Sequence, residues 1–278
     1  MRDTGGKVLR TGAVVVASVA LLAGCSSGGG GDDGGDGKAP RRTPGTSASG
    51  SPGGKASGTP KPTGPDFTPD PNKAPRDTAS ARQLALATVA GPEEWGPEYV
   101  RRPQYLSDPD YWPVLDANCE WETGALPRSV LYSVTAYSQI PAVGGKGLLK
   151  VASTVTVHRT ESDADWEMAG TLEEALRCPD QQLRQGERIT RLLSLGIPYN
   201  TFDNTYATDT ILERGSYLDE AVKGPQFYTW MQTRVGQVTV AAVVKGAPGY
   251  TEADVTDAQA RANVVMQDRI KKQLGVSS

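Results

Sequence analysis

Histidine and cysteine are scarce in this 278-residue sequence, which has His158 as its single histidine and only three cysteines. One histidine excludes metal sites built from several histidines, and the available cysteines do not complete a recognisable zinc pattern with it. A serine hydrolase needs an oriented serine beside its histidine, yet no Gly-x-Ser-x-Gly element occurs after residue 78. We therefore expect no metal, no cofactor and no catalytic residue, and we interpret His158 as a surface or strand-end histidine.

Long apolar runs are also missing. The N-terminal apolar run covers only residues 13–22, whereas a membrane-spanning helix needs about 20 apolar residues. Three basic residues precede the run, and it ends in Leu22-Ala23-Gly24-Cys25, the lipobox pattern of bacterial lipoproteins. We predict that residues 1–24 are a lipoprotein signal peptide and that Cys25 carries acyl chains such as palmitate. The alternative is an ordinary signal peptide with a chance cysteine.

Residues 26–78 contain no Val, Ile or Leu, and Phe67 is their only aromatic residue. Such a Gly-, Ser-, Pro- and Thr-rich segment buries too little apolar surface to offset its chain entropy, so we expect it to be disordered. Together with the lipidated cysteine it forms a tether, residues 25–78, that spans roughly 40 Å as a Gly-rich coil. The expected location is the outer face of the cell membrane, with the membrane itself as the partner of the acyl chains.

Residues 79–278 have a globular composition and the length of one extracytoplasmic domain. They carry 19 basic and 25 acidic residues without a basic stripe, so we expect no nucleic-acid partner. Clustered strand patterns with helices between and after them favour an α+β fold, an antiparallel sheet with helices packed on one face. Strands are expected at 130–140, 148–158, 210–218, 226–235 and 237–245, and helices at 80–89, 162–176 and 251–274.

The segment 92–127 is rich in Pro, Trp and Tyr and has no regular periodicity, so we expect it to be irregular. Loops of this kind on a rigid scaffold concentrate binding residues, and prolines lower the entropy cost of holding aromatic rings in place. The alternative is that these rings fill the core beneath the loop. The candidate ligand-binding residues are Trp95, Tyr99, Tyr111 and Trp112.

Cys119 and Cys178 are the two cysteines that lipidation of Cys25 leaves free. An even number of cysteines in an extracytoplasmic domain favours a disulfide. This bridge would join the segment 92–127 to the end of the helix expected at 162–176. The alternatives are a catalytic thiol, for which His158 would be the base, and a metal site.

Carboxylates gather along the helix expected at 162–176. Two carboxylates at a suitable separation can hydrolyse glycosides. The simpler interpretation is that negative charge near the helix start complements the helix dipole, and that Glu173 and Glu174 lie on a solvated face. The group comprises Asp163, Asp165, Glu167, Glu173 and Glu174.

The order of these features resembles a known family. After the lipobox, the tether and a short helix come Asp116-Ala117-Asn118-Cys119-Glu120-Trp121, a strand pair, a helix ending in Glu174-Ala175-Leu176-Arg177-Cys178, a hairpin with Trp230 and Val238-Thr239-Val240, and a terminal helix. This layout is similar to the sensor-domain lipoproteins of actinobacteria, relatives of the extracellular domain of PknH-type receptor kinases, over roughly residues 79–276. The resemblance implies a mixed α/β domain with a cleft for an unknown ligand, and it assigns no binding residues.

Three functions remain open at this point. A ligand-binding or sensor domain predicts a large, partly apolar cleft that holds several aromatic residues. A structural or interaction lipoprotein of the envelope predicts a closed surface with one flat apolar patch. A wall or glycan hydrolase predicts two carboxylates that face each other across a groove. We favour the first, a non-enzymatic cell-surface lipoprotein with an unknown ligand.

Overall fold

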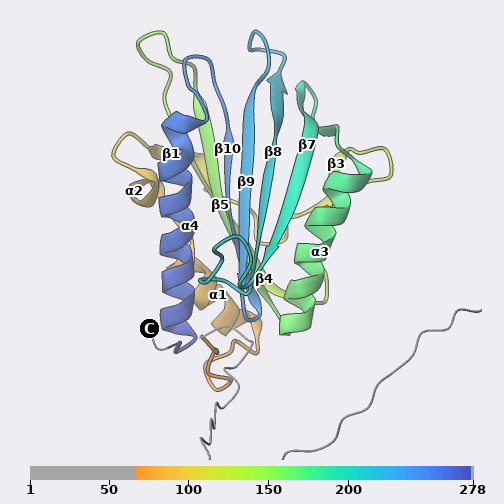
Figure 1. Ribbon diagram of the computed structural model, residues 1–278, viewed down its shortest axis with the longest axis vertical. Coiled ribbons are helices and arrows are strands. Elements are labelled where there is room, and N and C mark those ends of the chain that lie inside the picture. Colours follow the sequence, from red (N-terminus) through yellow and green to blue (C-terminus); the bar gives the residue numbers. More distant parts are fainter. Residues whose placement is uncertain (1–66, 277–278) are drawn as a thin grey trace, which may run out of the picture. The chain divides into compact units, whose positions relative to one another are not determined.

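An eight-stranded antiparallel sheet forms the centre of the structure, a computed structural model that describes residues 67–276 (Figure 1). The strand order is β1-β4-β5-β10-β9-β8-β7-β6, and β2 pairs with β3 in a separate hairpin. The strands are β1 Val100–Leu106, β2 Trp112–Leu115, β3 Trp121–Gly124, β4 Val130–Ile140, β5 Leu149–His158, β6 Gln181–Arg184, β7 Glu187–Pro198, β8 Asp209–Asp219, β9 Gln226–Val235 and β10 Val238–Lys245. The predicted α+β class and the antiparallel sheet are therefore confirmed.

Apolar and polar side chains alternate along the central strands, so that one face of the sheet is apolar and the other is more polar. On β5, Val155 and Val157 belong to the hydrophobic core, while Thr154 and Thr156 point to the opposite face. The neighbouring strands β9 and β10 are joined at Gly236, whose φ of +58° lies in the left-handed region that favours glycine. The expected tight hairpin is present, and its strands differ from the expected ranges by at most one residue.

Four helices complete the fold: α1 Thr78–Thr88, α2 Pro92–Trp95, α3 Glu161–Arg177 and α4 Ala253–Gln273. Helix α1 begins after Asp77, whose carboxylate accepts a 2.8 Å hydrogen bond from the backbone N–H of Ser80. Asp77 is therefore the N-cap, and Ser80 is its partner in a capping box. Helix α4, which is expected at 251–274, buries an apolar stripe that runs from Val255 to Ile270.

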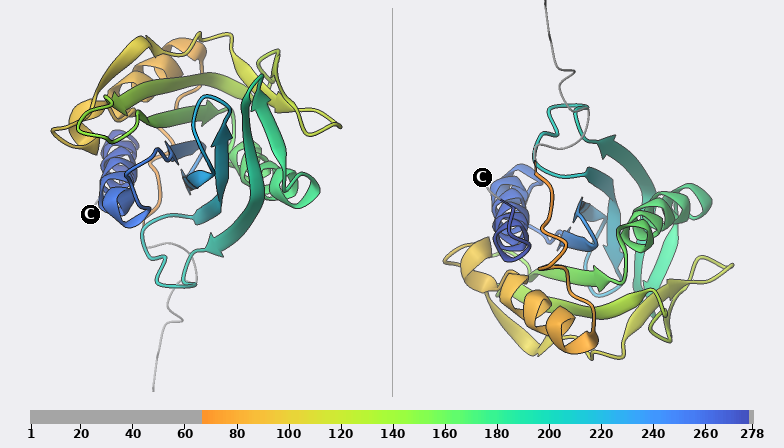
Figure 2. Two further views of the ribbon diagram at one scale, coloured as in Figure 1. Left: turned by 90° about the horizontal axis from the view of Figure 1, so that it is seen from above. Right: turned by 90° about the horizontal axis from the view of Figure 1, so that it is seen from below.

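The helices lie on both faces of the sheet. On one face, the hydroxyl of Thr229 in β9 donates a 3.0 Å hydrogen bond to Gln259 of α4. On the other, Thr171 of α3 donates a 2.9 Å hydrogen bond to Gln232, three residues further along β9. Because successive strand residues point to opposite faces, α4 and α3 must lie on opposite sides, and the end-on views show the central strands between them (Figure 2). The expectation of helices on one face is wrong for α3.

The packed part of the chain begins earlier than residue 79. The ring of Phe67 lies edge-on to Tyr199 with centroids 6.3 Å apart, and the backbone N–H of Asp70 donates to the carbonyl of Leu274 over 2.8 Å. Residues 67–78 are thus part of the folded domain, and the expected tether boundary at 78 is too late. The predicted signal peptide and Cys25 lie outside the described residues. No helix within residues 67–276 is long and apolar enough to cross a membrane.

The segment 92–127 is more regular than expected, since it contains α2, β1 and the hairpin β2–β3. Strand β7 was not anticipated either. Its register against β8 shifts between Thr190 and Leu193, and Arg191 has a φ of +55°. Such a bulge adds a residue to one strand and interrupts the two-residue repeat on which strand prediction depends.

Candidate ligand-binding cavity

A cavity of about 800 Å³ lies on the face of the sheet that carries α3. Its walls come from strands at both ends of the sheet, β1 and β6, as well as from α3 and the hairpin β2–β3. Because one cavity contacts strands this far apart, the sheet must curl around it, and the curl is visible in Figure 2. The volume falls within the roughly 300–1,000 Å³ typical of small-molecule sites.

Strand register places a row of mostly apolar side chains across the cavity floor. Each member of the row is paired with the next on the neighbouring strand, and all of them line the cavity. From β4 to β8 the row reads Tyr137, Ala152, Val243, Trp230 and Glu213. The floor therefore combines small apolar side chains with two aromatic rings, and it ends in a carboxylate.

The next two rows along the strands each begin with a pair of hydroxyl side chains. The hydroxyl oxygens of Thr135 and Thr154 lie 2.9 Å apart, and those of Ser133 and Thr156 lie 3.0 Å apart. Each hydroxyl can donate one hydrogen bond and accept two, so these pairs keep free hydrogen-bonding capacity toward the cavity. The floor thus offers polar groups at regular spacing beside its apolar row.

Cations gather at the end of the cavity where β5, β10 and β6 meet, and every one of them has a carboxylate partner. The Nζ atom of Lys150 lies 3.0 Å from Glu187 and 3.3 Å from Asp219, and the Nζ atom of Lys245 lies 3.2 Å from Glu187. Arg184 also pairs with Glu187. Burial raises the pKa of Glu187, but the three cations outweigh it and lower that pKa to about 2.

Two glutamates in the cavity have no such partner. Glu174 of α3 and Glu213 of β8 line the cavity, and neither forms an ion pair with a Lys or Arg of the described residues. Burial raises the pKa of each carboxyl to about 7, and at Glu174 the charge of Arg177 partly opposes this rise. At Glu213 the neighbouring Ser194 hydroxyl opposes this rise, and the charge of Glu174 adds to it. Glu174 therefore faces the cavity, and its expected position on a solvated face beside Glu173 is wrong.

His158 also lines the cavity, at the end of β5. Its Nε2 atom lies 2.7 Å from Oε2 of Glu167, which also accepts a 2.5 Å hydrogen bond from the hydroxyl of Thr239. The ring is only 2% exposed, and its Nδ1 atom has no hydrogen-bond partner among residues 67–276. His158 is thus a strand-end histidine, as predicted, but it is buried rather than on the surface.

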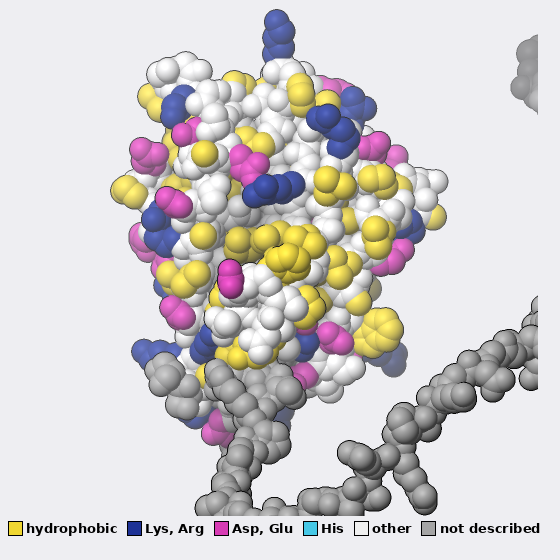
Figure 3. All heavy atoms as spheres, in the orientation of Figure 1, with side chains coloured by type: hydrophobic (Ala, Val, Ile, Leu, Met, Phe, Trp, Pro, Cys, Tyr) yellow, Lys and Arg dark blue, Asp and Glu magenta, His cyan; other side chains and the backbone are white. Residues whose placement is uncertain are grey.

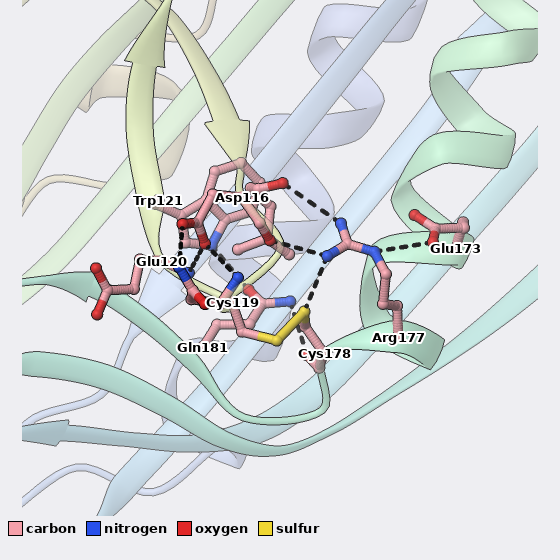
Figure 4. Close-up of a disulfide and its surroundings, with 10 residues drawn as sticks. Asp116, Cys119, Glu120, Trp121, Glu173, Arg177, Cys178 and Gln181 are labelled. Carbon is pink, nitrogen blue, oxygen red and sulfur yellow. Dashed lines mark hydrogen bonds and ion pairs between the residues drawn. A yellow bond between two sulfur atoms is a disulfide. The ribbon is translucent and has the colours of Figure 1, made fainter. Parts of the chain in front are cut away.

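The predicted disulfide between Cys119 and Cys178 is confirmed, with sulfur atoms 2.09 Å apart (Figure 4). It joins the turn of the hairpin β2–β3 to the end of α3. Two further links hold the same turn: Arg177 donates to the carbonyl of Asp116 over 2.9 Å, and the Trp121 indole donates to Gln181 over 2.8 Å. These contacts fix one wall of the cavity in place without a ligand.

The four candidate binding residues separate into two pairs. Tyr111 and Trp112 line the cavity from the hairpin side. Trp95 and Tyr99 belong to the hydrophobic core on the opposite face, with ring centroids 5.8 Å apart. The Trp95 indole is fully buried and donates a 3.0 Å hydrogen bond to Ser153, a β5 residue that points away from the cavity. For Trp95 and Tyr99 the structure therefore agrees with the alternative interpretation, in which the rings fill the core.

Several cavity aromatics come from regular elements that had simple packing patterns. Trp166 lies on α3, Tyr137 on β4, and Tyr228 and Trp230 on β9. The only sequence signal for Tyr228 and Trp230 was their two-residue spacing, which places them on one face of β9.

The sequence matches no model of a known protein family, and no curated protein matches it significantly.

Proposed function

We propose that residues 67–276 form a ligand-binding domain, which holds a small organic molecule in the cavity between the sheet, α3 and the hairpin β2–β3. The observation that supports this most strongly is the cavity itself, with a volume of about 800 Å³. Aromatic side chains on its walls provide contact area, and spaced hydroxyl groups provide orientation, which is the usual composition of a small-molecule site.

The N-terminal sequence supports the further proposal that this domain belongs to a cell-surface lipoprotein. Residues 1–24 would direct export, and acylation of Cys25 would attach the protein to the outer face of the cell membrane. The domain then works as a sensor or a capture module, in keeping with the resemblance to actinobacterial sensor-domain lipoproteins. A cleft for an unknown ligand is what that resemblance implies.

The glutamate pair bears on the alternative of a glycan hydrolase. Division of acid and base roles requires two carboxyl groups whose environments push their pKa values apart. Burial is the main cause that raises the pKa of both Glu174 and Glu213, so neither environment marks one of them as the acid and the other as the base. The hydrolase alternative is therefore supported only by the position of the two carboxylates in one cavity.

Exposed apolar side chains bear on the alternative of an interaction module. Leu176, Leu193 and Phe202 are 75–84% exposed and come from α3, β7 and the loop before β8. On the face in Figure 3, apolar side chains gather near the middle and charged side chains surround them. Single exposed apolar residues are common on monomeric proteins, so the cavity remains the stronger indication of function.

A ligand screen with a cavity variant tests the proposal. The full chain is screened by thermal shift and native mass spectrometry against wall fragments, lipids and small cationic, neutral and anionic metabolites. At least one compound should raise the melting temperature, and Trp112→Ala should reduce that shift. Phe202→Ala is the matched control, because Phe202 is 79% exposed and does not line the cavity. Equal shifts in both variants would place binding elsewhere.

A further inference from the structure

The charged side chains that line the cavity differ in whether they have an oppositely charged partner. Lys150, Lys245 and Arg184 all have carboxylate partners, and the Glu187 side chain that they share is only 5% exposed. Arg102 also lines the cavity; it forms no ion pair with a carboxylate of the described residues, and its guanidinium lies over the ring of Tyr137. Glu174 and Glu213 have no cationic partner among the described residues, although Glu213 is only 6% exposed. A buried carboxylate without a countercharge is costly, and a ligand that supplies the positive charge removes the cost.

Aromatic rings stand next to Glu213. Trp230 is the direct cross-strand neighbour of Glu213 on the cavity floor, and Tyr228 follows on the same face of β9. Side chains paired across two strands are about 5 Å apart at their Cβ atoms, so one small group can contact both. A carboxylate beside an indole ring favours an organic cation, which gains an ion pair and a cation–π contact together.

A buried histidine lies on the same side of the cavity, against α3. The Glu167 carboxylate accepts a hydrogen bond from Nε2 of His158, and Nδ1 of this 2% exposed, cavity-lining ring has no hydrogen-bond partner among residues 67–276. Glu167 and Glu174 are seven residues apart on the helix, a rise of roughly 10 Å.

From this arrangement we infer that the ligand is an organic ammonium compound whose positive nitrogen sits between Glu174 and Glu213, against the indole of Trp230. The inference rests on the proposed function, since it names the chemical class of the ligand for the same cavity. Sugars, fatty acids and phosphorylated compounds lack the positive charge that the two carboxylates require.

Matched probes separate charge from shape. Choline and 3,3-dimethylbutan-1-ol have nearly the same shape, but only choline carries a charge; spermidine and benzylammonium extend the cationic set, and butane sulfonate represents anions. Binding to the full chain is measured by calorimetry at pH 8. At least one ammonium compound should bind, and its neutral or anionic counterpart should bind at least tenfold more weakly.

Two isosteric variants locate the charge. Glu213→Gln and Glu174→Gln should each weaken ammonium binding at least tenfold, whereas Glu220→Gln should leave it unchanged, because Glu220 is exposed and outside the cavity. Equal ammonium affinity in the wild type and both cavity variants would overturn the inference. Binding of neutral or anionic compounds alone would overturn it too, and the proposed function would still stand. No binding by any compound, in this set or in the broader screen, would remove both.

Discussion

Glu213 of β8 and Trp230 of β9 are cross-strand neighbours on the cavity floor. The carboxyl group is therefore held against an aromatic side chain in a site where it is 6% exposed, and burial raises its pKa from the ordinary 4.5 to about 7. A raised carboxyl pKa means that the folded protein holds the proton more tightly than the unfolded chain does.

The first prediction concerns Glu213→Gln in the absence of ligand. Stability from the protonated carboxyl is fully present below pH 4.5 and is lost as the pH rises through 7. The variant should therefore be more stable than the wild type at pH 8, by roughly 1–3 kcal/mol, and the difference should fade toward pH 4.5. Urea denaturation at several pH values measures it. A constant difference across this range would show that ionisation of Glu213 is not the cause.

Glu167 is predicted to fasten α3 to the sheet. Replacement by Ala leaves His158 and Thr239 without their shared acceptor, and loss of buried hydrogen bonds of this kind costs roughly 1–3 kcal/mol. Glu173→Ala is the control on the same helix, because that carboxylate is 60% exposed and pairs only with Arg177. Its effect should stay below about 0.5 kcal/mol. Similar losses of unfolding free energy in the two variants would contradict this role.

Removal of the disulfide should destabilise the domain and loosen the cavity wall. Cys119 and Cys178 are 59 residues apart, and closure of a loop of this length contributes about 4 kcal/mol in the chain-entropy model. The double variant Cys119→Ser, Cys178→Ser should therefore melt at a lower temperature. Hydrogen exchange should increase most in the hairpin β2–β3. A free-thiol titration of the denatured, unreduced wild type should find no thiol, and two thiols would disprove the bridge in solution.

The aromatic candidates should respond in two different ways. Trp95→Ala removes a fully buried ring from the core and should cost about 3–5 kcal/mol of stability. Trp112→Ala should keep the fold, as judged by circular dichroism, and lose affinity for a ligand found in the screen. Selective loss of binding in Trp95→Ala, with unchanged stability, would contradict the assignment of this residue to the core.

Cys25→Ala should abolish membrane attachment while export continues, because acyl chains are the anchor that the N-terminal sequence predicts. Cell fractionation measures this, with the culture medium and the washed membranes compared. Persistence of the exported variant in the washed membrane fraction would show that the protein is held in another way.

Much of the sheet was predictable because its strands have simple patterns. Strands β4 and β9 have the expected ends, and β5, β8 and β10 differ from expectation by a single residue at one or both ends. Regular alternation of β-branched and polar residues carries this information locally. The strands β1, β2, β3 and β7 lack it, because register shifts interrupt the two-residue repeat in β1 and β7, and β2 and β3 are only 4 residues long.

The α+β class, five of the ten strands, the long terminal helix and the cysteine pair were predictable, since each follows from local periodicity or from counting. The face of the sheet that α3 covers was not predictable, and neither was the set of side chains that meet in the cavity. Glu174, Glu213 and Trp230 come from α3, β8 and β9, and nothing local in the chain links them. Their proximity results from the curl and register of the sheet, which are properties of the whole fold.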